Sequence, residues 1–195
     1  MESRVRKLES EQKAIDNILL FSFDIFDTLI TRKVATPKGI FSLMQQNLKA
    51  NQDFTQDFRD NFYDIRIDSE RYAREYSKSQ GGSNEISFDD IYNQMQKTYF
   101  LSDESIKFLK ELEINTEIEN FIGIEQNINL VKDLINSNKR VVLISDMYYN
   151  SETLHRLLST VDSIFENITI YVSSEYKASK CEGTLYKIKI GRAHV

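Results

Sequence analysis

The sequence predicts an α/β fold whose core is a parallel sheet, with a block of helices inserted after the first strand. Short apolar runs that end in polar residues recur in distant parts of the chain, and helical patterns alternate with the later ones. Between these parts, residues 36–120 show helical periodicity and no good strand. The length of 195 residues and the hydrophobic content of 41% suit a core domain with a modest insertion.

The first strand is expected at residues 18–23, where an apolar run rich in leucine and phenylalanine stops at Asp24. A buried strand that ends in a carboxylate places it at the ligand-binding edge of a parallel sheet. Asp27 and Thr28 follow closely. A second carboxylate there could act as a general acid or base, but in a tight turn such side chains more often bond the local backbone. The polar residues 3–17 predict a leading helix or arm.

The helical block is expected to begin after residues 36–39, where a proline and a glycine break the strand pattern. Residues 87–90 have the spacing of a capping box and predict the start of a helix, and the apolar spacing of residues 106–112 indicates another. A single helical face is expected to carry Phe58, Phe62, Ile65, Tyr72 and Tyr76.

Arg66, Glu70 and Arg74 stand four residues apart on the same expected helix. They could form a basic edge that faces a substrate. We prefer the interpretation that they form an exposed ladder of weak ion pairs.

Strand and helix alternate in the last third of the chain, which predicts βαβ units and a parallel sheet. The expected elements are a helix at 124–135, a strand at 140–144, a helix at 154–161 and a strand at 168–172. The first of these strands leads into Ser145 and Asp146. The second leads into a loop rich in serine and glutamate that reaches Lys180.

Asp24, Ser145 and Lys180 are the candidate catalytic residues, because each follows an expected strand. A carboxylate can attack phosphorus and form an aspartyl-phosphate. A serine hydroxyl can donate to a phosphoryl oxygen, and a lysine ammonium can offset the charge of both nucleophile and phosphate. Each residue alone has an ordinary structural explanation, but their shared placement suggests an aspartate-based phosphoryl-transfer site.

Composition argues against several functional classes. The net charge is −5 with no long run of Lys or Arg, so no nucleic-acid partner is expected. No apolar run approaches the ~20 residues of a membrane span. The single cysteine and the charged N-terminus fit a cytoplasmic protein. With two histidines and one cysteine, a bound metal is expected to be Mg²⁺ held by oxygen ligands rather than Zn²⁺.

Together these motifs resemble the haloacid dehalogenase-like (HAD) hydrolase superfamily. Its first motif, an apolar strand followed by Asp and, four residues later, Thr, matches residues 23–29. Its second motif matches residues 142–145, and its third matches residues 173–180. The segments Ser-Phe-Asp-Ile-Phe-Asp-Thr-Leu and Ser-Asp-Met-Tyr look most like a predicted-hydrolase branch often associated with glycosyltransferases of bacterial surface polysaccharides.

The resemblance implies a Rossmann-like core from residues 1–35 and 121–195 and a helical cap from residues 36–120. It implies a hydrolase for a small-molecule substrate, such as a phosphorylated metabolite, together with a glycosyltransferase domain or partner. The implied site comprises catalytic Asp24, Ser145 and Lys180, substrate-binding Thr28 and Asp146, and Mg²⁺ held by Asp24 and the backbone carbonyl of Phe26.

One departure from the family pattern opens two alternatives. HAD phosphatases carry a second Asp two residues after the nucleophile, and this chain has Phe26 there and Asp27 one residue later. An aromatic residue at that position is similar to the dehalogenase pattern, in which the aspartate attacks carbon without Mg²⁺. It is also compatible with a non-catalytic binding module of a polysaccharide-assembly protein.

The C-terminal residues 190–195 read like one frame of a sequencing-library adapter. We expect the natural protein to continue, and the fourth acidic motif of the family to lie beyond Lys180. Without that motif, this 195-residue chain is expected to bind Mg²⁺ weakly and to be inactive.

Overall fold

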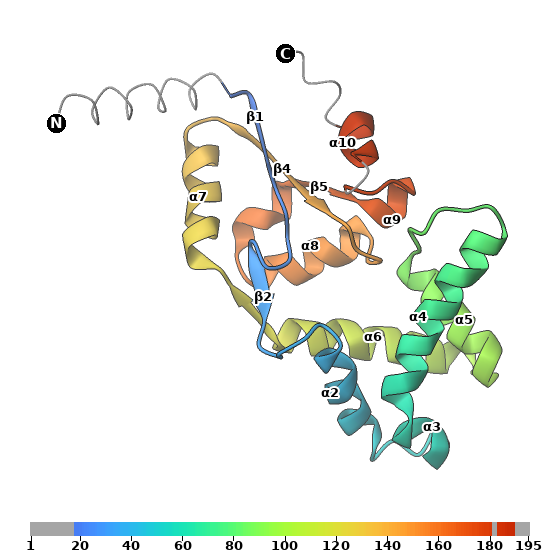
Figure 1. Cartoon of the computed structure of the whole chain (residues 1–195). Helices are drawn as coiled ribbons and strands as arrows, with labels where there is room; N and C mark the ends of the chain where they lie inside the picture. The colour runs from blue at the N-terminus through green and yellow to red at the C-terminus, as the bar shows by residue number, and fades with distance from the viewer. Residues whose placement is uncertain (1–17, 181–182, 190–195) are drawn as a thin grey trace, which may run out of the picture.

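The computed structural model describes residues 18–180 and 183–189, and Figure 1 shows the arrangement of their helices and strands. The expected arm at residues 3–17 and the tail at residues 190–195 lie outside the described residues. The chain forms a mixed α/β structure with a parallel three-stranded sheet. Its strands, in spatial order, are β1 (Leu20–Phe23), β4 (Arg140–Ser145) and β5 (Thr169–Val172).

The two faces of the sheet pack against different helices because successive side chains of a strand point to opposite faces. Leu143 and Ile170 belong to the main hydrophobic core, together with residues of α7 (Glu125–Asn136) and α8 (Ser151–Ser159). Val142 and Ile144 face the other way and pack with Leu185 of α10 (Thr184–Lys189). The apolar run of β4 is therefore continuous because both of its faces are buried.

A second, two-stranded sheet pairs β2 (Ile30–Arg32) with β3 (Phe121–Gly123) in antiparallel register. These strands are not predicted by the sequence, since three residues are too few to show a periodic pattern. A Cβ on Gly123 would lie 2.7 Å from Val161 Cγ1 and 2.8 Å from Ile128 Cδ1. The close approach of these side chains favours glycine at this point of β3.

Five helices lie between β2 and β3 in the chain, and we call them the helical block. They are α2 (Gly39–Leu48), α3 (Gln56–Asp60), α4 (Phe62–Ser79), α5 (Phe88–Tyr99) and α6 (Asp103–Glu119). The predicted capping box at α5 is confirmed: the Ser87 side chain accepts from the amide of Asp90, and the Asp90 side chain accepts from the amide of Ser87. Figure 1 shows the block beyond the end of β1, with α4 beside α5.

Two local predictions were wrong. The single helical face expected from Phe58 to Tyr76 is broken at Asn61, where α3 ends and α4 begins, and Tyr72 and Tyr76 are exposed. The loop expected after β5 begins with a short helix, α9 (Ser173–Tyr176).

Between α8 and β5 the chain forms a 3-10 helix, η1 (Ser163–Asn167).

Candidate active site

Asp24 follows β1 directly, at the carboxyl edge of the parallel sheet. Its Oδ1 atom accepts a hydrogen bond from the amide of Ile25 at 2.8 Å and lies 2.7 Å from Lys180 Nζ. The Asp24 side chain is 45% exposed, and among the described residues its Oδ2 atom accepts no hydrogen bond. One oxygen is thus fixed by two donors, while the other is open to an incoming group.

The turn after Asp24 is closed by its own backbone. The amide of Asp27 donates to the carbonyl of Ile30 at 2.7 Å, and Asp27 adopts a positive φ of 57°. Its Oδ1 atom accepts from the hydroxyl of Thr31 at 3.0 Å. Aspartate tolerates this left-handed conformation because its side chain can bond locally. Asp27 therefore acts as a turn residue, in line with the interpretation preferred from the sequence.

Phe26 and Thr28 have different surroundings within that turn. The Phe26 ring packs against Phe121, with ring centroids 5.9 Å apart, and the Arg32 guanidinium lies 4.6 Å from its centroid. The carbonyl of Thr28 accepts from the Asn127 side chain at 2.7 Å. Position 26 therefore offers a ring and no acidic proton.

Ser145 is the last residue of β4, and Asp146 follows it. Ser145 is 1% exposed, and within residues 18–180 its hydroxyl makes no hydrogen bond to Asp24 or Lys180. Asp146 is exposed, and both of its carboxylate oxygens accept from the backbone amide of Lys180, at 2.9 and 3.1 Å. Asp146 does not cap α8, because the Asn150 side chain accepts from the amide of Thr153 at the start of that helix.

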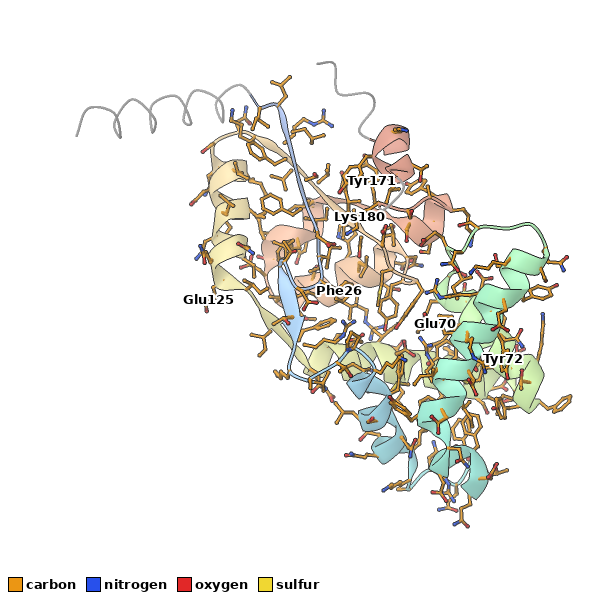
Figure 2. All side chains as sticks on the ribbon, viewed as in Figure 1. Phe26, Glu70, Tyr72, Glu125, Tyr171 and Lys180 are labelled. Carbon is orange, nitrogen blue, oxygen red and sulfur yellow. The ribbon has the colours of Figure 1, made fainter. Side chains whose placement is uncertain are left out.

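The structure brings Lys180, rather than its neighbours in sequence, to Asp24. The Lys180 side chain is 19% exposed. Lys177 instead donates to the carbonyl of Glu85 at 3.1 Å and lies 3.5 Å from Asp90 of the helical block. Figure 2 shows Lys180 near the sheet edge.

A pocket of about 680 Å³ lies between this edge and α4. Asp146, which contacts Lys180, is part of its lining. Apolar side chains line it from both sides, and charged side chains of α4 are spaced along one face of the helix. In Figure 2, Phe26 lies on the sheet side and Glu70 across from it on α4. The apolar lining residues are Phe26, Pro37, Phe41, Ile67, Met147 and Tyr148, and the charged residues of α4 are Glu70, Arg71, Arg74, Glu75 and Lys78.

Beneath the pocket is a charged cluster that the sequence analysis missed. The expected ion pairs form, because Glu70 lies 3.3 Å from Arg66 and 2.7 Å from Arg74. Their expected exposure is wrong for Arg66, which is fully buried together with Glu113. Burial alone would lower the pKa of Arg66, but the Glu113 carboxylate holds that pKa well above its ordinary value. The hydroxyls of Tyr92, Tyr148 and Tyr149 all donate to Glu113, at 2.8–3.2 Å.

A second arginine, Arg32, pairs with α6 one turn after Glu113. Arg32 of β2 donates to both carboxylate oxygens of Glu117, at 2.7 and 2.8 Å. Burial is the largest influence on Glu117 and raises the pKa of its carboxyl, while Arg32 opposes the rise. Glu113 and Glu117 could have been noticed in the sequence, because they fall on the apolar face that Ile106 and Leu109 define on α6.

The described residues do not by themselves fit a complete Mg²⁺ site. Residues 18–180 and 183–189 contain no group of three or more acidic, histidine or cysteine side chains that could hold a metal. Mg²⁺ takes octahedral oxygen ligands, usually including one or two carboxylates. Here Asp24 offers one carboxylate, which is already paired with Lys180. The Phe26 carbonyl remains an expected ligand only.

Comparison with known proteins supports the fold. No protein-family model matches the sequence, and a search of curated proteins finds no match either. Among solved structures, the chain is similar to the crystal structure of a dehalogenase, with a TM-score of 0.50 and 14% sequence identity. The match covers 91% of this chain and 72% of the dehalogenase chain. At this identity the likeness concerns the fold, which agrees with the α/β class expected from the sequence.

No helix within the described part of the chain is long and apolar enough to cross a membrane.

Proposed function

We propose that this protein is a HAD-like hydrolase in which Asp24 is the nucleophile, Lys180 its charge partner and Ser145 a donor to the substrate. The observation that carries the proposal is the 2.7 Å contact between Lys180 Nζ and Asp24 Oδ1, which leaves Oδ2 open. A carboxylate held by a cation at the carboxyl edge of a parallel sheet suits covalent catalysis. The preferred substrate is a small phosphorylated metabolite.

With such a substrate, Asp24 Oδ2 attacks phosphorus, an oxygen–phosphorus bond forms, and the bond from phosphorus to the leaving oxygen breaks. The leaving oxygen takes a proton from water. Water then attacks phosphorus of the aspartyl-phosphate, releases inorganic phosphate and restores Asp24. The Lys180 ammonium stabilises the negative charge that gathers between nucleophile and phosphoryl group. Ser145, at the end of the neighbouring strand, would donate to a phosphoryl oxygen, and Thr28 and Asp146 would contact the substrate.

The pocket beside α4 is the proposed place of the leaving group. Its volume of about 680 Å³ is typical of small-molecule sites. Phe26, Met147 and Tyr148 offer it apolar contacts, and arginines of α4 offer donors at the rim. In this proposal the helical block is the cap of the enzyme and selects the substrate. A glycosyltransferase domain or partner remains part of the proposal as well.

Mg²⁺ dependence also remains a proposal. Besides Asp24 and the Phe26 carbonyl, the ion would need further ligands, because the described residues contain no group of three or more metal-binding side chains. When bound beside them, the ion would neutralise charge on the phosphoryl oxygens.

A second candidate is hydrolysis at carbon, and Phe26 favours it. Within the described turn after Asp24, position 26 carries a ring rather than an acidic group, and the Asp27 side chain is bonded to Thr31. A halide leaves without protonation. Asp24 would then attack the carbon that bears the halide, and water would hydrolyse the resulting ester to an alcohol and free carboxylate.

The experiment is an assay of the full-length protein encoded at the genomic locus, against panels of phosphate monoesters and of halogenated acids, with and without EDTA. The proposed function requires phosphate release that EDTA abolishes and that Asp24→Asn eliminates without a loss of melting temperature. Halide release that persists in EDTA would establish the second candidate instead. Ligand binding with no turnover on either panel would identify a non-catalytic binding module.

A further inference from the structure

Asp146 holds the backbone of Lys180 rather than its side chain. Both carboxylate oxygens of Asp146 accept from the Lys180 amide, at 2.9 and 3.1 Å. This amide lies between α9 and α10 and takes part in no backbone hydrogen bond of the described residues. Hydrogen bonds to an ionised acceptor are stronger than neutral ones, and loss of Asp146 would remove the amide's partner.

The segment that carries Asp146 is itself fixed on two sides. On one side, the hydroxyls of Tyr148 and Tyr149 donate to Glu113 Oε1 at 3.1 and 3.2 Å, and the amide of Phe88 donates to the Tyr148 carbonyl at 2.7 Å. On the other, the Ser174 hydroxyl donates to the Tyr149 carbonyl at 3.0 Å. Residues 146–149 therefore bridge the helical block and the sheet edge.

We propose that Asp146 is a positioning residue that sets the place of the Lys180 ammonium at Asp24, and that residues 146–149 link this position to the helical block. The contacts form one chain, from Glu113 through the two tyrosines to Asp146, Lys180 and Asp24. Glu113 to the tyrosines and Asp146 to the Lys180 amide are hydrogen bonds, and Lys180 to Asp24 is an ion pair. The backbone of residues 146–149 joins the tyrosines to Asp146, and the Lys180 side chain joins its amide to its ammonium. The inference rests on the proposed pairing of Lys180 with the nucleophile, but its test requires no turnover.

The experiment measures the acetylation rate of each lysine by mass spectrometry in the 195-residue chain, with N-hydroxysuccinimidyl acetate as the reagent. In the unmodified sequence, Lys180 reacts more slowly than exposed lysines such as Lys97, since its side chain is 19% exposed and bonded to Asp24. The variant Asp24→Asn removes the ion pair and raises the Lys180 rate. This variant reports on the pairing that the proposed function needs.

The variant Asp146→Ala is expected to raise the Lys180 rate about fivefold, because a charge-assisted hydrogen bond is lost. Asp146→Asn retains an acceptor oxygen and is expected to restore most of the protection. Asp133→Ala is the matched control, because Asp133 is an exposed residue on α7. Tyr148→Phe combined with Tyr149→Phe keeps both rings, removes the bonds to Glu113, and tests the link to the helical block.

Each outcome separates one part of the inference from the rest. An unchanged Lys180 rate in Asp146→Ala, together with a raised rate in Asp24→Asn, overturns the positioning role and leaves the ion pair intact. An unchanged rate in Asp24→Asn contradicts the pairing itself and with it the proposed function. An unchanged rate in the double tyrosine variant overturns the link to the helical block. If Asp146→Ala does not fold, hydrogen exchange of the Lys180 amide decides: protection supports the bond to Asp146, and free exchange overturns it.

Discussion

Arg66 and Glu113 form a bidentate ion pair in which neither side chain is exposed to solvent. Arg66 Nε lies 2.7 Å from Glu113 Oε2, and Arg66 Nη2 lies 2.9 Å from Oε1. The pair joins α4 to α6, and the guanidinium also lies 4.5 Å from the centroid of the Phe41 ring on α2. Three helices of the block therefore meet at one compensated pair of charges.

Glu113→Ala is expected to lower the free energy of unfolding by about 3–5 kcal/mol, because Arg66 would keep a buried charge without its partner. Urea unfolding followed by circular dichroism measures the change. Glu119→Ala is the control, since Glu119 is an exposed residue near the end of the same helix. A loss of less than about 1 kcal/mol in Glu113→Ala would mean that water reaches Arg66 and solvates it.

Because position 26 carries a ring and no acid, we expect turnover to depend on the basicity of the leaving group. In a phosphatase reaction without a proton donor, turnover should fall steeply as the leaving group becomes more basic. Phe26→Asp places a carboxyl group near the leaving oxygen and is expected to raise turnover of the poorest leaving groups by about 100-fold. The measurement is kcat/KM of the full-length protein for aryl and alkyl phosphates whose leaving groups differ stepwise in basicity.

Phe26→Asn is the control for that change. Like Phe26→Asp, it removes the ring that lies beneath Arg32. Asparagine has nearly the size of aspartate, but it supplies no acidic proton. Equal rates for the two variants on every leaving group would contradict proton donation from position 26.

The proximity of Asp24 and Lys180 could be predicted from the sequence. Each of the three strands is long enough to show an apolar run, and parallel strands bring their carboxyl ends to one edge. A carboxylate after the first strand and a lysine after the last were therefore expected together, and they lie 2.7 Å apart. The bond from Asp146 to the Lys180 amide could not be predicted, because it depends on the path of a segment without regular structure.

The buried ion pairs could not be predicted from the sequence for a different reason. A local pattern shows which face of a helix carries charge, but burial of Arg66 depends on Glu113, 47 positions away in the chain. An arginine in a helical pattern is usually solvated, so the ladder interpretation followed the general rule. The strands β2 and β3 were missed because their pairing, from Ile30 with Gly123 to Arg32 with Phe121, is set by tertiary contact.

The capping box of α5 predicts how stability depends on pH. Burial acts to raise the pKa of Asp90, but hydrogen bonds from Ser87 and the Lys177 ammonium outweigh it and hold that pKa below its ordinary value of 3.8. The ionised carboxylate therefore stabilises the fold above this value, and the contribution is lost as pH falls through the lower pKa of the folded state. Asp90→Asn is expected to cost about 0.5 kcal/mol near neutral pH.

The test compares the two proteins by urea unfolding in steps from about pH 6 to about pH 2.5. Their free energies of unfolding are expected to differ at the upper end and to converge at the lower end. A difference that stays constant over the whole range would show that the charge of Asp90 does not contribute. Asp53→Asn is the control, because Asp53 is an exposed residue outside the helices.

Phe100 offers a substitution that should stabilise the protein. It ends α5 in the left-handed conformation, with φ of 54° and ψ of 41°, and its amide donates to the carbonyl of Gln96. The side chain is 93% exposed, so it buries little apolar surface. A Cβ atom costs roughly 1–2 kcal/mol in this conformation, and glycine avoids that cost at the end of a helix.

Phe100→Gly is therefore expected to raise the free energy of unfolding by about 1 kcal/mol, after allowance for the greater flexibility of glycine in the unfolded chain. Phe100→Ala separates the two causes, because it removes the ring but keeps the Cβ atom. If alanine stabilises the protein as much as glycine, exposure of the ring rather than backbone strain is the cause. A loss of stability in Phe100→Gly alone would mean that the aromatic ring contributes packing that its exposure conceals.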